Sequence, residues 1–312
     1  MARRLIGVDV GGTKIAVALL DGSTLLEPVL EPTNTSSAQA LVAQLVDAVR
    51  AAGDAAAVGV AVPSVVDWET GRIRSSVNIP LHDVPLREVL REQLGVPVYV
   101  DNDATCAALA EAYDDEGMLV ARHLVMFTVG TGVGGGIVIG GRIYRGATGA
   151  AAEIGHTIVG ADLRRAPFAH ADSFPQPGSL ESLASGSALN EIACEHGVTA
   201  GRVIDAARAG DPAALAAIEL LGRRLGVGIA NAINTFDPDL VVVGGGVSAA
   251  GELLLKPARE EAGRYRLTGV GTRTEIRRAR HGPLAGVRGA ALLAGQELES
   301  ELEYAAGEGA TT

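Results

Sequence analysis

The chain has 312 residues, of which 47% are hydrophobic and 20% are charged, a composition typical of a globular protein large enough for two domains. Its net charge of −11 at pH 7 argues against nucleic acid as a partner, because phosphate backbones are bound by basic surfaces. Only Cys106 and Cys194 are present, so we expect no disulfide framework and a reducing, cytoplasmic location. Charged residues interrupt the apolar stretches at 5–20 and 213–236, so we expect neither a signal peptide nor contact with a membrane.

Strands and helices alternate in the first third of the chain. Apolar runs bounded by glycine, proline or capping residues predict strands at 5–10, 14–20 and 25–30, a helix from Ser36 or Ser37 to about 52, a strand at 58–62, a helix at 85–94, a strand at 98–100 and a helix that starts near Asp103. The first two strands flank Gly11-Gly12, which indicates a hairpin.

The pattern of strand, glycine-rich turn and strand returns from Leu124 onward, with further strands predicted at 136–139 and 142–144. This repetition indicates an internal duplication of one structural unit. After an irregular stretch, the predicted elements are helices 187–196, 199–207 and 212–236, a strand at 240–243, a helix, a strand at 274–277 and a helix at 286–298. The alternation is typical of the α/β class.

Two glycine-rich turns, each containing a threonine, lie between predicted strands: Asp9-Val-Gly-Gly-Thr-Lys14 and the segment Gly130–Gly136. Glycine lets the backbone approach a phosphate closely, and the threonine hydroxyl and the amides can donate to its oxygens. An ordinary hairpin turn is the competing interpretation of each. A nucleoside triphosphate held between two lobes, however, needs two such turns, and neither has P-loop spacing.

Two further features fit a nucleotide site. Asp9 is placed to organise Mg²⁺, directly or through water, because Mg²⁺ prefers carboxylates and retained waters. Gly244-Gly245-Gly246 follows a buried strand and precedes a helix, so it can pack against a nucleoside. A tight strand-to-helix turn is the alternative.

Seven segments, in this order and spacing, resemble the ROK family (repressors, uncharacterised reading frames and sugar kinases), and bacterial glucokinases most of all: 9–14, 100–104, 130–136, 153–157, 181–186, 231–238 and 242–246. The resemblance runs from about residue 5 to 294. It implies an actin-like ATPase (ribonuclease H-like) fold with two lobes and an interlobe cleft. We expect a small lobe at 1–116 on which helix 286–298 packs back, a large lobe at 117–285, and a flexible tail at 299–312.

The resemblance also implies ATP-dependent phosphorylation of a hexose, with glucose to glucose 6-phosphate as the leading reaction. The family's general base corresponds to Asp103, for which a helix N-cap is the competing role. The implied sugar ligands are Asn78, Asn102, Asp103, Glu153, His156 and Glu181. The implied nucleotide-binding residues, with Asp9 for Mg²⁺, are Asp9, Gly11, Gly12, Thr13, Lys14, Gly130, Thr131, Gly132, Gly134, Asn231, Asn234, Gly244, Gly245 and Gly246.

The sequence departs from the family pattern near the expected sugar pocket. Most relatives carry three cysteines that bind structural zinc together with a histidine, and here those positions are Asp172, Phe174 and Ser179. A closed zinc site needs four nitrogen or sulfur ligands, so we expect no structural zinc and a loop held by its prolines and by packing of Phe174. Ser64 replaces a usual glycine, and no aromatic residue follows Asn78.

Several alternatives stay open at this point. The sugar can be mannose, fructose, N-acetylglucosamine or N-acetylmannosamine, and polyphosphate can be the donor, although Lys14 and Arg142 are few cations for a polyanion. The third alternative is that the protein is a non-catalytic regulator that binds a sugar. Repressors of the family carry an N-terminal helix-turn-helix, for which a first strand at about Leu5 leaves no room. A homodimer is expected because relatives commonly form one.

Overall fold

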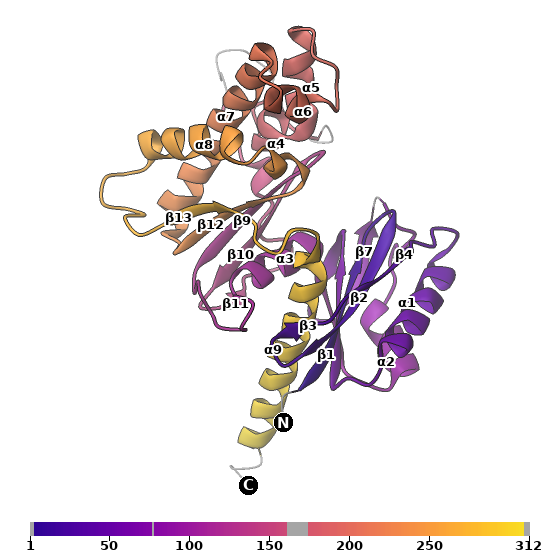
Figure 1. Ribbon diagram of the computed structural model, residues 1–312. Coiled ribbons are helices and arrows are strands. Elements are labelled where there is room, and N and C mark those ends of the chain that lie inside the picture. Colours follow the sequence, from indigo (N-terminus) through magenta and orange to yellow (C-terminus); the bar gives the residue numbers. More distant parts are fainter. Residues whose placement is uncertain (1–2, 77, 161–173, 309–312) are drawn as a thin grey trace. The chain divides into compact units, whose positions relative to one another are not determined.

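The computed structural model describes residues 3–76, 78–160 and 174–308. The described chain divides into two compact units (Figure 1): the first contains residues up to 120, 136–151 and from 283 onward, and the second contains 121–135 and 152–282. The sequence assigned all of 117–285 to one lobe, whereas 136–151 belongs to the first unit.

The first unit is an α/β layer structure built on a sheet of order β3-β2-β1-β5-β8, with β4 paired to β2. Its elements are β1 (Arg4–Val10), β2 (Lys14–Asp21), β3 (Thr24–Leu25), β4 (Val29–Pro32), α1 (Ala38–Ala52), β5 (Ala57–Val62), β6 (Ser64–Asp67), β7 (Arg72–Ser76), α2 (Leu86–Leu94), β8 (Val98–Asn102), α3 (Asp103–Glu111), β11 (Arg142–Ile143), η3 (Gly282–Leu284, at the boundary) and α9 (Ala285–Glu308).

Three local predictions for this unit were wrong. The single strand expected at 25–30 is two short strands, and the β6–β7 hairpin was not anticipated. The last helix does not end at 298 but continues to Glu308, so most of the tail expected to fray is helical. The residues after 298 are helix formers without glycine or proline up to 306, which permits this continuation.

The two faces of the first sheet are covered by different helices, as period-two alternation requires. Ile6, Val8 and Val10 of β1 share a core with residues of α1 and α2, whereas Leu5 packs with residues of α9. Gly7 and Gly59 lie so close to α9 that a Cβ on either would overlap its backbone. The face that carries Leu5, Gly7 and Asp9 is therefore the face that α9 covers.

The second unit combines a parallel sheet core with a cluster of helices. Its elements are β9 (Leu124–Val129), η1 (Ile154–His156), α4 (Leu180–Ala184), α5 (Gly186–Glu195), α6 (Val203–Arg208), α7 (Pro212–Phe236), β12 (Leu240–Gly244), η2 (Gly246–Ala250), α8 (Glu252–Tyr265) and β13 (Glu275–Arg278). The second sheet has the order β11-β10-β9-β12-β13, and β10 (Val133–Ile139) carries the chain from the second unit into the first.

Two details of this part matter for the site. β10 begins at Val133 rather than at residue 136, so the strand starts inside the glycine-rich segment. Helix α7 has the bounds that the sequence predicts: Asp211 caps it by accepting a bond from the Ala214 amide at 2.9 Å, and Pro212 opens it. In the part of the chain that the structure describes, no helix has the length and apolar character needed to cross a membrane.

Candidate active site

Polar residues of the first unit gather where its three parallel strands end. β1 pairs with β5 in parallel, and β5 with β8, so that Asp9, Ala61 and Asp101 stand at the same level across the sheet. β1 then leads into the Gly11 turn and β8 leads directly into α3. Ligands of open α/β sheets commonly bind outside this carboxyl edge.

The start of α3 is held by Asn102 and not by Asp103. The Asn102 side chain accepts bonds from the amides of Ala104 at 3.0 Å and Thr105 at 3.2 Å, which makes it the N-cap. Asp103 is the first helical residue, and its Oδ1 accepts from the Ala104 amide at 2.8 Å. The capping role considered for Asp103 therefore belongs to Asn102.

The carboxyl groups of Asp103 and Asp9 both have raised pKa values. Burial raises the pKa of Asp103, while the backbone amides of Ala104 and of Asp103 itself lower it. Burial, and then the charge of Asp103, raise the pKa of Asp9 to about 7 against the opposing effect of Lys14. Asp9 also touches the start of α9, because a Cβ on Gly286 would overlap its carboxylate. Two mutually repelling carboxylates thus lie at one edge of the sheet.

Carboxylate oxygens are ligands that Mg²⁺ prefers, so these two side chains are suited to binding it. The described residues contain no group of three or more His, Cys, Asp or Glu side chains able to hold a metal. Mg²⁺ is commonly bound by one or two carboxylates together with waters and substrate phosphates. Asp9 would hold such an ion, and the ion would supply charge neutralisation of the phosphates.

The first glycine turn is closed by its own backbone and supported by neighbours. The Gly11 amide donates to the Lys14 carbonyl at 2.9 Å, and the Thr33 hydroxyl donates to the Gly11 carbonyl at 2.6 Å. Thr13 and Lys14 are exposed. Asn78 lies directly against the turn, because a Cβ on Gly12 would come within 3.1 Å of the Asn78 Cβ.

The second glycine turn is held by the first residues of α5. The Gly186 amide donates to the Gly130 carbonyl at 2.7 Å, and the Ser187 hydroxyl donates to the Thr131 carbonyl at 2.9 Å. The Val133 amide donates to Oε2 of Glu181 at 2.7 Å. The turn thus has a side chain from α4 bound to its backbone.

Glu153 directly precedes η1, His156 is the last residue of η1, and η1 packs on the same turn. A Cβ on Gly155 would overlap the Val133 carbonyl, and the Leu180 amide donates to the Thr157 carbonyl at 2.9 Å, so η1 and α4 are adjacent. His156 Nε2 lies 3.8 Å from Glu153 Oε2. His156 Nδ1 is buried and has no hydrogen-bond partner among the described residues, as expected of a group that binds a ligand.

The loop that carries zinc in most relatives is only partly described. Asp172, at one of the positions of the zinc-binding cysteines, lies outside the described residues. Phe174 is 64% exposed, and its ring meets the His156 ring edge-on with centroids 5.3 Å apart. The absence of structural zinc and the role of Phe174 in holding this loop stay predictions.

The residues expected to bind the nucleoside come from the helix before β12 and from the turn after it. Gly245, with φ of 79°, packs against the backbone of Val129, so the Gly244–Gly246 turn adjoins the Gly130 turn. Asn231 and Asn234 lie near the end of α7, which leads into the opposite end of β12. The Asn234 side chain bonds the Tyr265 carbonyl at 3.0 Å and the Leu267 amide at 2.9 Å. The grouping of Asn231 and Asn234 with the nucleotide-binding residues stays a prediction.

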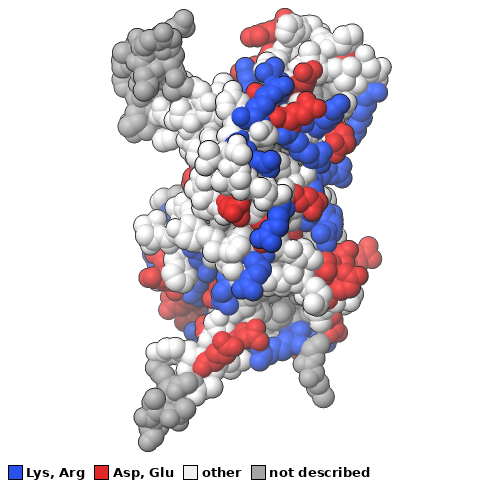
Figure 2. Space-filling model, turned by 90° about the vertical axis from the view of Figure 1, so that its left-hand side faces the viewer, with Lys and Arg blue, Asp and Glu red and all other residues white. Residues whose placement is uncertain are grey.

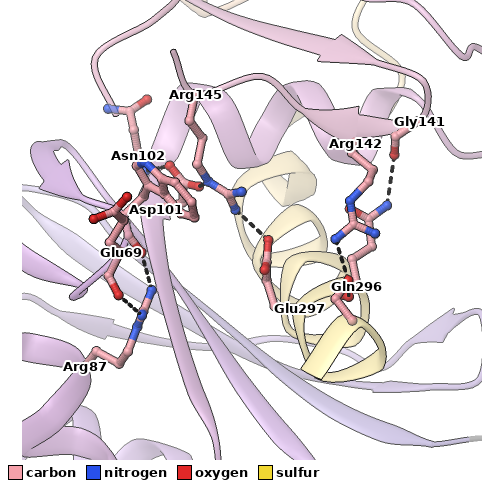
Figure 3. A network of polar contacts seen from close by, with 11 residues as sticks. Glu69, Arg87, Asp101, Asn102, Gly141, Arg142, Arg145, Gln296 and Glu297 are labelled. Atoms are coloured by element: carbon pink, nitrogen blue, oxygen red, sulfur yellow. Dashed lines mark hydrogen bonds and ion pairs between the residues drawn. The ribbon is translucent and has the colours of Figure 1, made fainter. Parts of the chain in front are cut away.

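Sequence reasoning missed an ion-pair network behind α3 (Figure 3). Oδ2 of Asp101 lies 2.7 Å from Nε of Arg145, whose Nη2 lies 2.8 Å from Oε1 of Glu297. These residues come from β8, the segment after β11 and α9, and no sequence pattern joins them. Ser64 is also buried, and its hydroxyl has no partner in the part of the chain described.

The fold and the two glycine turns identify the class of protein to which this chain belongs. The chain has the mixed α/β, actin-like ATPase fold with two lobes, as do the sugar-kinase structures that it resembles. It matches the ROK family model over residues 5–297 and belongs to that family. It is similar to the ROK hexokinase from Thermus thermophilus, with TM-score 0.81, 36% identity and coverage of 95% of this chain and 99% of that one.

Two further relatives are named as glucokinases. A ROK family glucokinase from Streptomyces griseus, solved in complex with glucose and AMPPNP, matches with TM-score 0.75 and 33% identity over 94% of this chain and 99% of that one. The glucokinase of Halalkalibacterium halodurans is 37% identical over 325 residues, covering 96% of this chain and 97% of that protein.

Proposed function

We propose that this protein is an ATP-dependent hexose kinase that converts glucose to glucose 6-phosphate, with Asp103 as general base. The observation that carries the proposal is a buried carboxyl group of raised pKa at the start of α3, beside Asp9 and not engaged as the helix cap. The glucokinase names of relatives at 37% and 33% identity support glucose as the sugar.

Each proposed group has a defined task. Asp103 accepts the proton of a sugar hydroxyl as that oxygen attacks the terminal phosphorus of ATP, and ADP leaves. Amides of the Gly11 and Gly130 turns donate to phosphate oxygens, and Asp9 holds Mg²⁺. The other sugar ligands that we propose are Asn78, Asn102, Glu153, His156 and Glu181.

A coupled ADP-release assay with glucose, mannose, fructose and N-acylated amino sugars tests the proposal. Asp103→Asn should lower kcat by about 10²- to 10⁴-fold, the range typical of a lost general base. The change should leave the fold intact, because Asn102 keeps the cap. Near-wild-type turnover of this variant would refute the choice of base, and ADP release that no sugar stimulates would refute the kinase.

We also propose ATP rather than polyphosphate as the donor. A long polyanion requires a continuous basic track, and on the face in Figure 2 basic and acidic side chains are interspersed. We also propose that the protein is cytoplasmic, because it has only two cysteines in 312 residues. We propose a homodimer because members of its family commonly form one. Light scattering of the purified protein measures the oligomer.

A further inference from the structure

The network behind α3 reaches the base through one residue. We propose that Arg145 is a positioning residue for Asp103: it fixes the Asp101 carboxylate, and this carboxylate fixes the backbone from which α3 starts. The inference rests on the proposed function, since it takes Asp103 to be the base.

Arg145 is held on three sides within the first unit (Figure 3). Its Nε lies 2.7 Å from Oδ2 of Asp101 and its Nη2 lies 2.8 Å from Oε1 of Glu297. The guanidinium stands 5.3 Å from the centroid of the Trp68 ring, within the range of a cation–π contact. The Arg145 and Asp101 side chains are 16% and 3% exposed, so water does not replace these contacts.

The second oxygen of Asp101 extends the network to the base. Oδ1 of Asp101 accepts a bond from the Asn102 amide at 2.8 Å. Asn102 in turn caps α3 through the amides of Ala104 and Thr105. A chain of bonds therefore runs from Arg145 to the residue directly before Asp103.

This network is better explained by the positioning of the backbone at α3 than by stabilisation of the fold. Burial raises the pKa of Asp101, and the charge and hydrogen bond of Arg145 oppose this increase, so Arg145 favours the ionised carboxylate and holds it in place. A buried ion pair seldom stabilises a fold more than apolar residues of similar size. Glu297 belongs to α9, which packs on the backbone of β1 and β5, so Arg145 connects the backbone before the base to a helix packed closely on the sheet. A displacement of about 1 Å at a reacting group can lower the rate about a hundredfold.

Arg87 offers a matched control. Its guanidinium donates to the carbonyls of Trp68 at 2.5 Å and Glu69 at 2.7 Å, in the same neighbourhood and without a bond to Asp101. Arg145→Met and Arg87→Met each remove a guanidinium that is mostly shielded from water. Far-UV circular dichroism reports the folded fraction of both variants, because Trp68 itself contacts both guanidinium groups.

The steady-state kinetics of these variants in the sugar-dependent ADP-release assay test the inference. We expect Arg145→Met to lower kcat per folded molecule by about tenfold or more, with the KM values for ATP and sugar within about threefold of wild type. Arg87→Met should lose comparable stability and keep kcat. Arg145→Lys, which restores a cation beside Asp101, should recover part of kcat.

Equal kcat for folded Arg145→Met and wild type would overturn this inference but leave the proposed function standing. An effect on KM without an effect on kcat would do the same. If Arg145→Met does not fold, Glu297→Gln decides: a kcat lowered about two- to fivefold at unchanged KM supports positioning, and an unchanged kcat refutes it. A wild-type protein without sugar-dependent ADP release would instead overturn the proposed function, and this inference with it.

Discussion

The Glu181 carboxylate accepts a hydrogen bond from the Val133 amide at 2.7 Å. A proposed sugar ligand is thus bonded to the proposed phosphate turn, within one structural unit. Gly132 makes the contact possible, because a Cβ at this position would overlap Oε2 of Glu181. Changes at Glu181 should therefore affect both substrates, and in separable ways.

Glu181→Gln and Glu181→Ala should differ in their effect on the nucleotide. Glutamine keeps an oxygen for the Val133 amide, so its KM for ATP should stay near that of wild type while its KM for the sugar rises. Alanine leaves the amide unpaired and should raise both KM values by about tenfold, as expected for a lost hydrogen bond to a charged group. Equal KM values for ATP in the two variants would show that the bond does not shape the turn.

The dependence of kcat/KM on pH should reveal Asp103. The base acts only when deprotonated, and burial raises its pKa above the ordinary value of an aspartate. Activity should therefore fall with decreasing pH, with a midpoint above the ordinary pKa of an aspartate. The remaining activity of Asp103→Asn should not show this decrease with falling pH.

The same shift has a consequence for stability. The folded-state pKa of Asp103 exceeds the unfolded-state value, so its ionisation reduces stability as the pH rises from the unfolded pKa through the folded one. Asp103→Asn should be at least as stable as wild type at neutral pH, measured by thermal unfolding. A variant clearly less stable at neutral pH would contradict this assignment.

Adjacent glycines of the Gly244–Gly246 turn should respond differently to substitution by alanine. Gly245 has φ of 79°, and a Cβ there would overlap the Val129 backbone. Gly245→Ala should lower the free energy of unfolding by about 2–4 kcal/mol, from the left-handed backbone and the overlap together. Gly246 has nothing within 4 Å of a Cβ, so Gly246→Ala should change it by less than about 1 kcal/mol. Circular dichroism during chemical unfolding measures both.

Metal analysis should find no structural zinc. Of the residues expected at the zinc position, Phe174 offers no ligand atom and Ser179 is the N-cap of α4, where its hydroxyl accepts from the Ser182 amide. We expect well under about 0.1 zinc per chain, and full activity after a chelator is removed and Mg²⁺ is restored. One tightly bound zinc per chain would contradict this expectation.

Local sequence patterns predicted much of the fold correctly because they express local physics. Asp211 and Pro212 mark the start of α7, and Ser37 caps α1, where a side-chain oxygen meets free amides of the first turn. Both glycine turns follow β-branched strands, as the pattern of the motifs indicates. The placement of Asn231 and Asn234 could not be predicted, since spacing along one helix does not tell which end of the sheet that helix approaches.

The sequence alone determined the class of protein: α/β alternation, two glycine turns and seven ordered motifs depend on short-range backbone and side-chain chemistry. Only the tertiary structure decided which groups act on one another. It bonded Glu181 to Val133 and made Asn102 the cap beside Asp103. It also joined Asp101, Arg145 and Glu297, which are up to 196 positions apart in the sequence. Contacts of this kind arise from the packing of whole layers, and no local pattern encodes which residues two layers bring together.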